Sequence, residues 1–503
     1  MVAFVDRLLV ADRRGRDHTK NAYKEALNMR MMLRRYRRGA VVASTVTGSM
    51  LIALAMAVPA GASTVAASNF ALNSAGSNTT YTMMQQLSDL YNSAPGCNLL
   101  TANSANQELN YACASSYSTS APGDENGYNL TYSPINPYND VVWDEPALGS
   151  GNGIKELELE GADTPTSPPN NLIANTDFAR SSRAAVTSGT GDDKSGLNFV
   201  AYAEDAVPWL YFSKTTGSGA CATTPASSVS AAGLSTSQLA GIYEGTITNW
   251  STVGGANAPI DVFIAQSGSG TEGTWVADLA LSGTYPYGGV TATAARLSLP
   301  ASDFEIFENE VSDIWSLNNA HASDKIACDS IFFFSYGKYS LLCPSGACAG
   351  TPTSNAGSVA KLGEIGGVKA SKKTIQNGSF ALDRQLYNVY SDGFNSNLPF
   401  AGSPQPKEGQ AVMNFASTYG FLCSPTTHNA VDPLSPTGAK YGTEIDNIIT
   451  ANGFFPIKLG VEGDASIATP PDFTDPGYAA ASPTPSGDDG YCRVTTTDGD
   501  GNN

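Results

Sequence analysis

Small polar residues between an apolar strand and an amphipathic helix are the most distinctive chemical feature of this sequence. The loop reads Ser267-Gly268-Ser269-Gly270-Thr271. Apolar residues alternate over 260–265, which indicates a strand, and the residues after the loop have the spacing of a helix that packs one face. Such a loop presents backbone N–H groups and hydroxyls at the positive end of a helix dipole, so we interpret it as a candidate anion site.

Three further loops of similar composition lie upstream. They are residues 76–81, with Thr79, Thr80 and Tyr81 at the start of a helix; residues 149–153, with Ser150; and residues 177–183, with Arg180, Ser182 and Arg183. A dehydrated oxyanion needs many fixed donors, because removing its water is costly unless every oxygen is hydrogen-bonded. Four separated loops of hydroxyls, backbone N–H groups and arginines allow two lobes to close over such a ligand.

Other phosphate and catalytic motifs fit less well. A Walker-type loop is excluded, because no lysine follows the Ser267–Thr271 loop until Lys325. A hydrolase remains an alternative, but Gln266 stands where a nucleophile elbow needs its first glycine, and a base would have to be His321 or His428. There is no C-x-x-C pair, and His321 and His428 are the only histidines after the proposed cleavage site, so neither a metal nor another cofactor is predicted.

Composition limits the class of protein. The chain has 503 residues and a formal net charge of −18, which argues against a nucleic-acid partner and leaves anion binding to local geometry. Strands alternate with helices, so we expect an α/β fold with mainly parallel sheets and a ligand site beyond the carboxyl ends of the strands.

The N-terminal part has the pattern of an export signal. Arginines at 34–38 precede an apolar run over 40–58 and an Ala-Gly-Ala cleavage site at 60–62. Retention of the run as a membrane anchor is an open alternative. Export also suits the eight cysteines, which we expect in disulfides; Cys97–Cys113 and Cys343–Cys348 are plausible pairs, although the connectivity stays open.

Several of these loops, together with one further string of residues, resemble a known family. The string Gly245-Thr246-Ile247-Thr248-Asn249-Trp250, followed by the Ser267–Thr271 loop, is similar to the phosphate-binding proteins of ABC transporters, and the three upstream loops resemble that family's other ligand loops in the same order. The resemblance implies a type II periplasmic-binding-protein fold with two α/β lobes and a ligand cleft between them.

Carried over by position, the resemblance implies the phosphate donors. Thr79, Thr80, the N–H of Tyr81 and Ser150 would serve from the first lobe, and Ser269, Gly270 and Thr271 from the second. Two departures stand out. The family's arginine before the Ser-Gly-Thr loop is missing, and Ser182 stands in place of an aspartate that accepts a proton from phosphate.

These departures change what the site is expected to do. We infer that Arg180 or Arg183 supplies the missing positive charge from the opposite lobe. Without the aspartate, the preference for phosphate over sulfate or another oxyanion is open.

The resulting prediction divides the chain into a leader and signal peptide and two lobes. The segments are 1–62 for the leader, 63–198 with 385–492 for the first lobe, 199–384 for the second, and 493–503 for a disordered tail. We expect an exported monomer, extracellular, at the cell surface or periplasmic, that captures inorganic phosphate for an ABC-transporter permease. A secreted phosphate scavenger or adhesin without a permease is the alternative hypothesis, as is a binding protein for sulfate or another oxyanion. The role of residues 93–142 stays open.

Overall fold

The fold can be followed through most of the chain after the predicted leader. The computed structural model describes residues 71–94, 97–102, 109–113, 141–145, 147, 149–159, 176–186, 193, 197–214, 225–229, 233–343, 354–355, 358–391, 412, 414–417, 420–432, 434–457 and 491–496. The predicted signal segment and most of residues 93–142 lie outside this part. Among the helices described, none is both long and apolar enough to cross a membrane.

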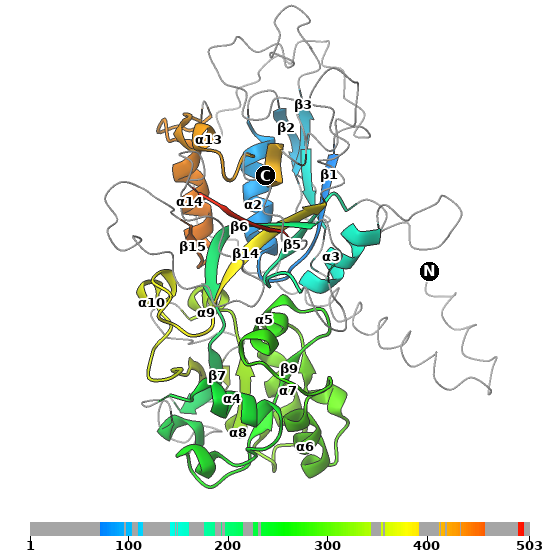
Figure 1. The fold of residues 1–503 in the computed structure, drawn as a ribbon, viewed down its shortest axis with the longest axis vertical. Helices are drawn as coiled ribbons and strands as arrows, with labels where there is room; N and C mark the ends of the chain where they lie inside the picture. The colour runs from blue at the N-terminus through cyan, green and yellow to red at the C-terminus, as the bar shows by residue number, and fades with distance from the viewer. Residues whose placement is uncertain are drawn as a thin grey trace, which may run out of the picture. The chain divides into compact units, whose positions relative to one another are not determined.

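The larger sheet has seven strands (Figure 1). Its order is β15 (Phe455–Pro456), β6 (Leu197–Ala206), β14 (Asp383–Ser391), β5 (Phe178–Ser181), β1 (Ala71–Gly76) and β4 (Val141–Asp144), and β16 (Arg493–Thr496) also pairs with β6. Strand β1 runs parallel to β4 and β5, whereas β14 runs antiparallel to β5 and β6. The expectation of mainly parallel sheets is therefore wrong, because strands that return late in the chain enter this sheet in the opposite direction.

The smaller sheet has five strands. Its order is β12 (Ser354–Asn355), β13 (Ser358–Leu362), β7 (Trp209–Lys214), β11 (Ser330–Phe333) and β8 (Asp261–Val262). Two separate pairs complete the described strands: β9 (Ile264–Ala265) with β10 (Glu305–Ile306), and β2 (Cys97–Ala102) with β3 (Leu109–Cys113). The fold is therefore mixed α/β.

Helices cover these sheets. They are α2 (Tyr81–Asn92), α3 (Ser150–Leu159), α4 (Thr236–Tyr243), α5 (Gly270–Asp278), α6 (Gly288–Leu297), α7 (Ser312–Ala320), α8 (Ile326–Asp329), α9 (Tyr336–Leu342), α10 (Lys372–Gln376), α13 (Pro425–Asn429) and α14 (Tyr441–Ala451). Alternate residues of β6 face different cores: Val200 and Tyr202 belong to the cluster that includes residues of α2 and α14, and Phe199 and Ala201 to the cluster that includes residues of α3. Both faces of the larger sheet are thus buried, which explains the continuous apolar run from Phe199 to Ala203 in β6.

The chain passes between the two sheets twice. It leaves the larger sheet after Ala206, enters the smaller one at Trp209, and returns at Asp383. The predicted boundary at residue 198 falls inside β6, which runs on to Ala206. Residues 493–496, predicted to be part of a disordered tail, form β16 along β6.

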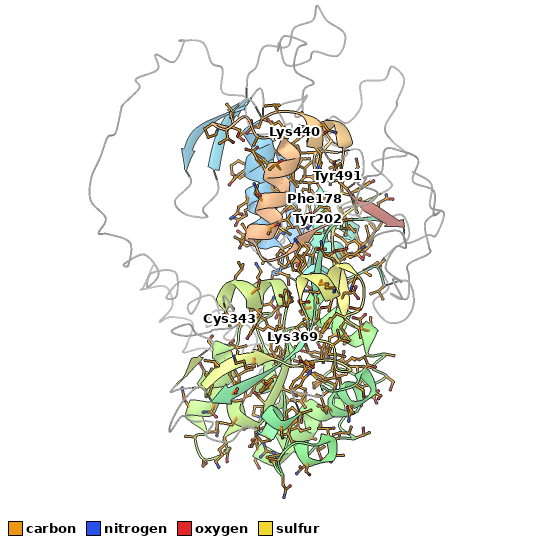
Figure 2. The ribbon with its side chains drawn as sticks, turned by 90° about the vertical axis from the view of Figure 1, so that its left-hand side faces the viewer. Phe178, Tyr202, Cys343, Lys369, Lys440 and Tyr491 are labelled. Carbon is orange, nitrogen blue, oxygen red and sulfur yellow. A yellow bond between two sulfur atoms is a disulfide. The ribbon has the colours of Figure 1, made fainter. Side chains whose placement is uncertain are left out.

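Cysteines tie together distant parts of the chain. Cys423 and Cys492 form a disulfide, and Cys328 and Cys343 are also disulfide-bonded. Cys97 and Cys113 are register partners at the ends of the β2–β3 pair. Figure 2 shows the side chains that fill the described cores.

Candidate functional site

The Ser267–Thr271 loop leads from a strand into a helix, as the sequence predicts. Ser269 is the N-cap residue of α5, and its Oγ accepts a hydrogen bond from the backbone N–H of Glu272 at 3.1 Å. Gly268 has a φ of 85°, in the left-handed region that favours glycine. The loop therefore has the geometry of an anion-binding helix N-terminus.

A second predicted loop packs directly against the first. The backbone N–H of Gly151, near the start of α3, donates to the carbonyl of Gly268 at 3.0 Å. A Cβ atom added to Gly149 would lie 2.5 Å from the same carbonyl oxygen, so only glycine allows this approach. The N-termini of α3 and α5 thus lie side by side, although 120 positions of sequence numbering separate Ser150 from Gly270.

Three buried hydroxyls converge on the carboxylate of Glu308. Thr271 Oγ1 donates to Glu308 Oε1 at 2.6 Å, Ser269 Oγ donates to Oε2 at 2.6 Å, and Thr79 Oγ1 donates to Oε1. We call Thr79, Ser269 and Thr271 the hydroxyl cluster. Thr79 follows β1 of the larger sheet, whereas the other two residues precede or open α5, so the cluster joins both parts of the fold.

Each hydroxyl of the cluster also accepts a hydrogen bond. Thr271 Oγ1 accepts from Arg384 Nη1 at 3.0 Å, Thr79 Oγ1 accepts from Asn309 Nδ2 at 3.2 Å, and Ser269 Oγ accepts from the backbone N–H of Glu272. A hydroxyl has a single hydrogen to donate, and these acceptor roles leave that hydrogen for Glu308. The surroundings therefore orient three donors toward the oxygens of one anion.

A second group of predicted residues packs beside the cluster. Ser150 Oγ and Ser182 Oγ lie 3.2 Å apart, and the backbone N–H of Ser182 donates to Ser150 Oγ at 3.0 Å. A Cβ atom added to Gly270 would lie 2.1 Å from Ser150 Oγ and 2.4 Å from Ser182 Oγ. The fold therefore brings together the predicted residues Ser150, Ser182 and Gly270.

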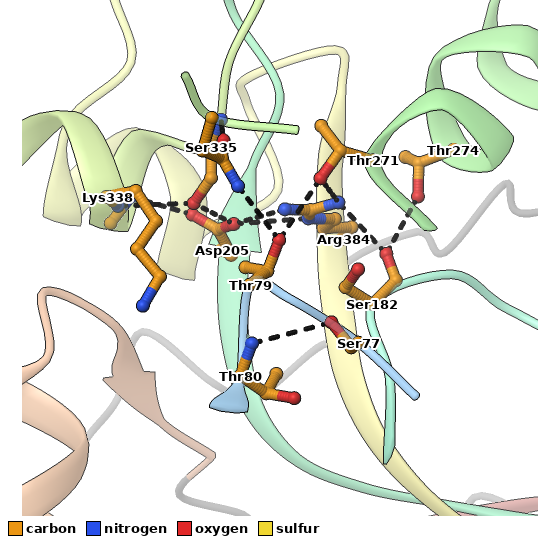
Figure 3. Close-up of polar contacts among 12 residues, drawn as sticks. Ser77, Thr79, Thr80, Ser182, Asp205, Thr271, Thr274, Ser335, Lys338 and Arg384 are labelled. Atoms are coloured by element: carbon orange, nitrogen blue, oxygen red, sulfur yellow. Dashed lines mark hydrogen bonds and ion pairs between the residues drawn. The ribbon is translucent and has the colours of Figure 1, made fainter. Parts of the chain in front are cut away.

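Arg384 on β14 is the arginine that reaches this site, and the sequence analysis did not identify it. Its Nη1 also donates to the carbonyl of Ser182 at 3.0 Å, and its Nη2 lies 2.7 Å from Asp205 Oδ2 (Figure 3). Asp205 in turn accepts from Ser335 Oγ at 2.7 Å and from the backbone N–H of Gly337 at 2.9 Å. Arg384 is a lone arginine near the start of β14, and no local motif marks it.

The two predicted arginines have other partners. Arg180 is fully buried and contacts Ser74 and Asp144, and it donates to the carbonyl of Glu145 at 2.8 Å. Arg183 forms a two-pronged ion pair with Asp193 at 2.7 and 2.8 Å. In the part of the chain that the structure describes, neither guanidinium is brought to the hydroxyl cluster, because acids of the larger-sheet region hold them.

The remaining predicted residues lie at the N-terminus of α2. Thr80 is the N-cap residue and makes no side-chain capping hydrogen bond; its side chain instead interacts with the buried hydroxyl of Tyr202. The Tyr81 hydroxyl accepts from Gln85 Nε2 at 3.0 Å, and the Tyr81 ring lies 5.2 Å from the Arg180 guanidinium carbon.

Acidic groups crowd the site. Burial raises the pKa of Glu272 well above its usual range, and the nearby charges of Glu305 and Glu308 add to this effect. Burial lowers the pKa of Lys338 to about 8, against the opposing influence of Asp205 and Glu308. Among the described residues, no group of three or more His, Cys, Asp and Glu side chains could hold a metal ion.

The string that suggested the family resemblance has a packing role. Trp250 is fully buried, and its Nε1 donates to the carbonyl of Asp329 at 2.9 Å. Its ring centroid lies 6.0 Å from that of Trp209 in the core of the smaller-sheet region. This string thus stabilises the part of the fold from which the Ser267–Thr271 loop extends.

Comparison with known proteins gives a family match and several solved structures of low similarity. A family model described as a PBP superfamily domain matches residues 60–415. An ABC-type phosphate transport receptor from Vibrio cholerae is 16% identical, with a TM-score of 0.38 over 76% of this chain and 99% of the receptor. A phosphate-binding protein from Stenotrophomonas maltophilia is 14% identical, with a TM-score of 0.32 over 77% and 90%. No curated protein sequence matches.

Proposed function

The chain belongs to the PBP superfamily, and from that membership and the hydroxyl cluster we propose that it is a solute-binding protein for inorganic phosphate. The observation that carries the proposal is the set of three hydroxyls directed at the two oxygens of Glu308. Serine and threonine hydroxyls at the N-terminus of a helix are suitable donors for a tetrahedral oxyanion. Phosphate oxygens would take the hydrogen bonds that the carboxylate oxygens now accept.

Arg384 supplies the positive charge in this proposal. Its Nη1 already donates to Thr271 Oγ1, so the guanidinium polarises that hydroxyl and stands next to the anion. Asp205 fixes the orientation of the guanidinium from the opposite side. We therefore assign to Arg384 the role that the sequence analysis gave to Arg180 or Arg183.

The site is proposed to bind without catalysing a reaction. Ser269 Oγ donates to a carboxylate, whereas His428 lies against the carbonyl of Leu422 and the ring of Tyr491, and His321 lies near Asp324. In the described part of the chain, Ser269 thus has no histidine partner that would activate it as a nucleophile.

Transport follows from the same proposal. We propose that the two sheet regions are lobes that move about the connections at 207–208 and 382–383. Apart from these boundaries, we keep the ranges of the first and second lobes that the sequence predicts. The exported protein would close on phosphate and deliver it to an ABC permease. A scavenger without a permease would share the site but support no uptake.

Titration calorimetry of phosphate and sulfate into the chain lacking residues 1–62 tests the proposal. We expect one phosphate per chain, with a Kd below about 10 μM. Stronger binding of sulfate would keep the oxyanion site but change the ligand. Binding of neither anion would contradict the proposal, and phosphatase activity lost in Ser269→Ala would identify a hydrolase instead.

A further inference from the structure

Glu308 occupies the place that the proposed function gives to phosphate. Only 3% of its surface is exposed, and both of its carboxylate oxygens accept hydrogen bonds from the hydroxyl cluster. The three hydroxyls are those proposed to bind the anion. A ligand and this side chain therefore require the same hydrogens.

The backbone around Glu308 is fixed to the residues just before the Ser267–Thr271 loop. Ile306 pairs with Ala265 in the β9–β10 ladder, and the N–H of Glu308 donates to Gln266 Oε1 at 2.6 Å. Asn309 has a φ of 60°, and its Oδ1 accepts from the backbone N–H of Ser335 at 2.9 Å. These contacts fix the backbone on both sides of Glu308, and the Glu308 carboxylate therefore lies at Ser269 and Thr271.

Simultaneous occupancy would be unfavourable. Each hydroxyl has one hydrogen, so a phosphate oxygen that accepts it leaves a Glu308 oxygen without that donor. The carboxylate and the phosphate would also repel each other, because Glu308 is buried and little water screens the two charges. One of the two anions has to leave.

We propose that Glu308 is an internal competitor for the anion site: its carboxylate holds the hydroxyl cluster in the ligand-free protein, and phosphate binds by displacing it. This inference rests on the proposed function. The neighbouring Phe307 is 36% exposed, so the displaced carboxylate has water close by. The affinity for phosphate is then the intrinsic affinity multiplied by the fraction of molecules in which Glu308 has left the cluster.

Removing Glu308 should change the phosphate affinity in one direction if Glu308 competes with phosphate and in the opposite direction if Glu308 contacts the bound phosphate. If Glu308 occupies the cluster in 90–99% of ligand-free molecules, its removal tightens phosphate binding by about ten- to a hundredfold. If Glu308 instead contacts the bound anion, its removal weakens binding. The sign of the change distinguishes the two roles.

The experiment compares Glu308→Gln and Glu308→Ala with wild type and with Glu310→Gln as the control. Glu310 lies in the same connection, and its Oε2 accepts from Ser312 Oγ at 3.3 Å, so its variant removes an equal charge without vacating the cluster. Calorimetry should give tighter phosphate and sulfate binding by the Glu308 variants, within the range above, and a change under about threefold for Glu310→Gln.

Thermal unfolding adds a second readout. The ligand-free Glu308→Ala variant should melt below wild type, because three hydroxyls lose their acceptor, yet phosphate should raise its Tm more than that of wild type. Equal or weaker anion binding by folded Glu308 variants would overturn the inference and leave the proposed function intact. Failure of wild type and every variant to bind either anion would overturn both.

Discussion

Arg384 and Asp205 lie opposite each other on strands β14 and β6, and the guanidinium donates to one carboxylate oxygen from Nη2 at 2.7 Å and from Nε at 3.1 Å. Both side chains are almost completely buried. The remaining nitrogen, Nη1, contacts Thr271 in α5 and the carbonyl of Ser182. This ion pair therefore connects the strands at which the chain passes between its two sheets with the hydroxyl cluster.

Replacing both charged residues of the Arg384–Asp205 pair by neutral ones should weaken phosphate binding. A single Arg384 variant would leave Asp205 as an unpaired buried charge, so the double variant Asp205→Asn/Arg384→Gln is the cleaner test. Loss of one charge-assisted contact costs about 1.5–3 kcal/mol, which corresponds to a fall in affinity of roughly 10- to 150-fold by calorimetry.

The matched control is Arg183→Gln/Asp193→Asn. It removes a second buried ion pair, in which Arg183 donates to both carboxylate oxygens of Asp193 and not to the hydroxyl cluster. We expect its phosphate affinity to stay within about threefold of wild type. Equal losses in the two double variants would argue that Arg384 has no special role at the site.

Gly270 should tolerate no side chain. Its added Cβ would lie 2.1 Å from Ser150 Oγ and 2.4 Å from Ser182 Oγ, and both hydroxyls are buried. Gly270→Ala should therefore separate α5 from this pair and weaken phosphate binding by more than about tenfold, because at least one hydrogen bond from α5 to the anion is lost.

Gly273→Ala on the same helix is the control. The nearest atom to its added Cβ is Arg183 Cδ at 2.8 Å, so alanine there presses on the Arg183–Asp193 pair and not on Ser150 or Ser182. Alanine also favours the helix over glycine by about 1 kcal/mol. Calorimetry that shows the same loss of affinity in both variants would rule out a specific effect at Gly270.

Glu156 in α3 should make stability depend on pH. Burial raises its pKa from 4.5 to about 7, and the charge of Glu145 contributes further. The folded chain therefore binds more protons than the unfolded chain between these values, so the stabilising contribution is complete below pH 4.5 and is lost as the pH rises through 7.

Glu156→Gln should remove this loss. Urea unfolding at several pH values should give the variant an advantage of about 1–3 kcal/mol at pH 8 that disappears near pH 4.5. Glu158→Gln, on the same helix, controls for charge. A constant difference between Glu156→Gln and wild type across the whole pH range would contradict the assignment.

The disulfide Cys423–Cys492 should contribute stability without affecting the ligand. It closes a segment of 69 positions and fastens the chain just before β16. Cys423→Ser/Cys492→Ser should lower the free energy of unfolding by about 2–4 kcal/mol. A double variant is preferable to a reductant, because Cys328 and Cys343 are also disulfide-bonded. Calorimetry should give an unchanged phosphate affinity, and a large loss would link the tail to the site.

Local features of the site could be predicted from the sequence. The strand, the Ser267–Thr271 loop and α5 follow from side-chain periodicity and from the preference for serine at a helix N-cap. The small residues at 149–151 likewise predict a helix start, and the fold places them against the anion loop.

Contacts between distant segments could not be predicted. Glu308 and Arg384 approach Thr271 only because the β9–β10 pair and the β6–β14 ladder bring together residues far apart in sequence. A lone acidic or basic residue has no local pattern that reveals such a position. For the same reason Arg180 and Arg183 appeared suitable, although Asp144 and Asp193 hold their guanidiniums.

The central claim is that the hydroxyl cluster binds phosphate, and calorimetry of wild type, Thr271→Val and Thr274→Val tests it most directly. Both threonines are buried on α5, but Thr274 Oγ1 donates to the carbonyl of Ser182, whereas Thr271 Oγ1 donates to Glu308 and accepts from Arg384. We predict that wild type binds one phosphate, that Thr271→Val weakens binding by at least about tenfold, and that Thr274→Val changes it by less than about threefold. Equal phosphate binding by wild type and Thr271→Val would contradict the account.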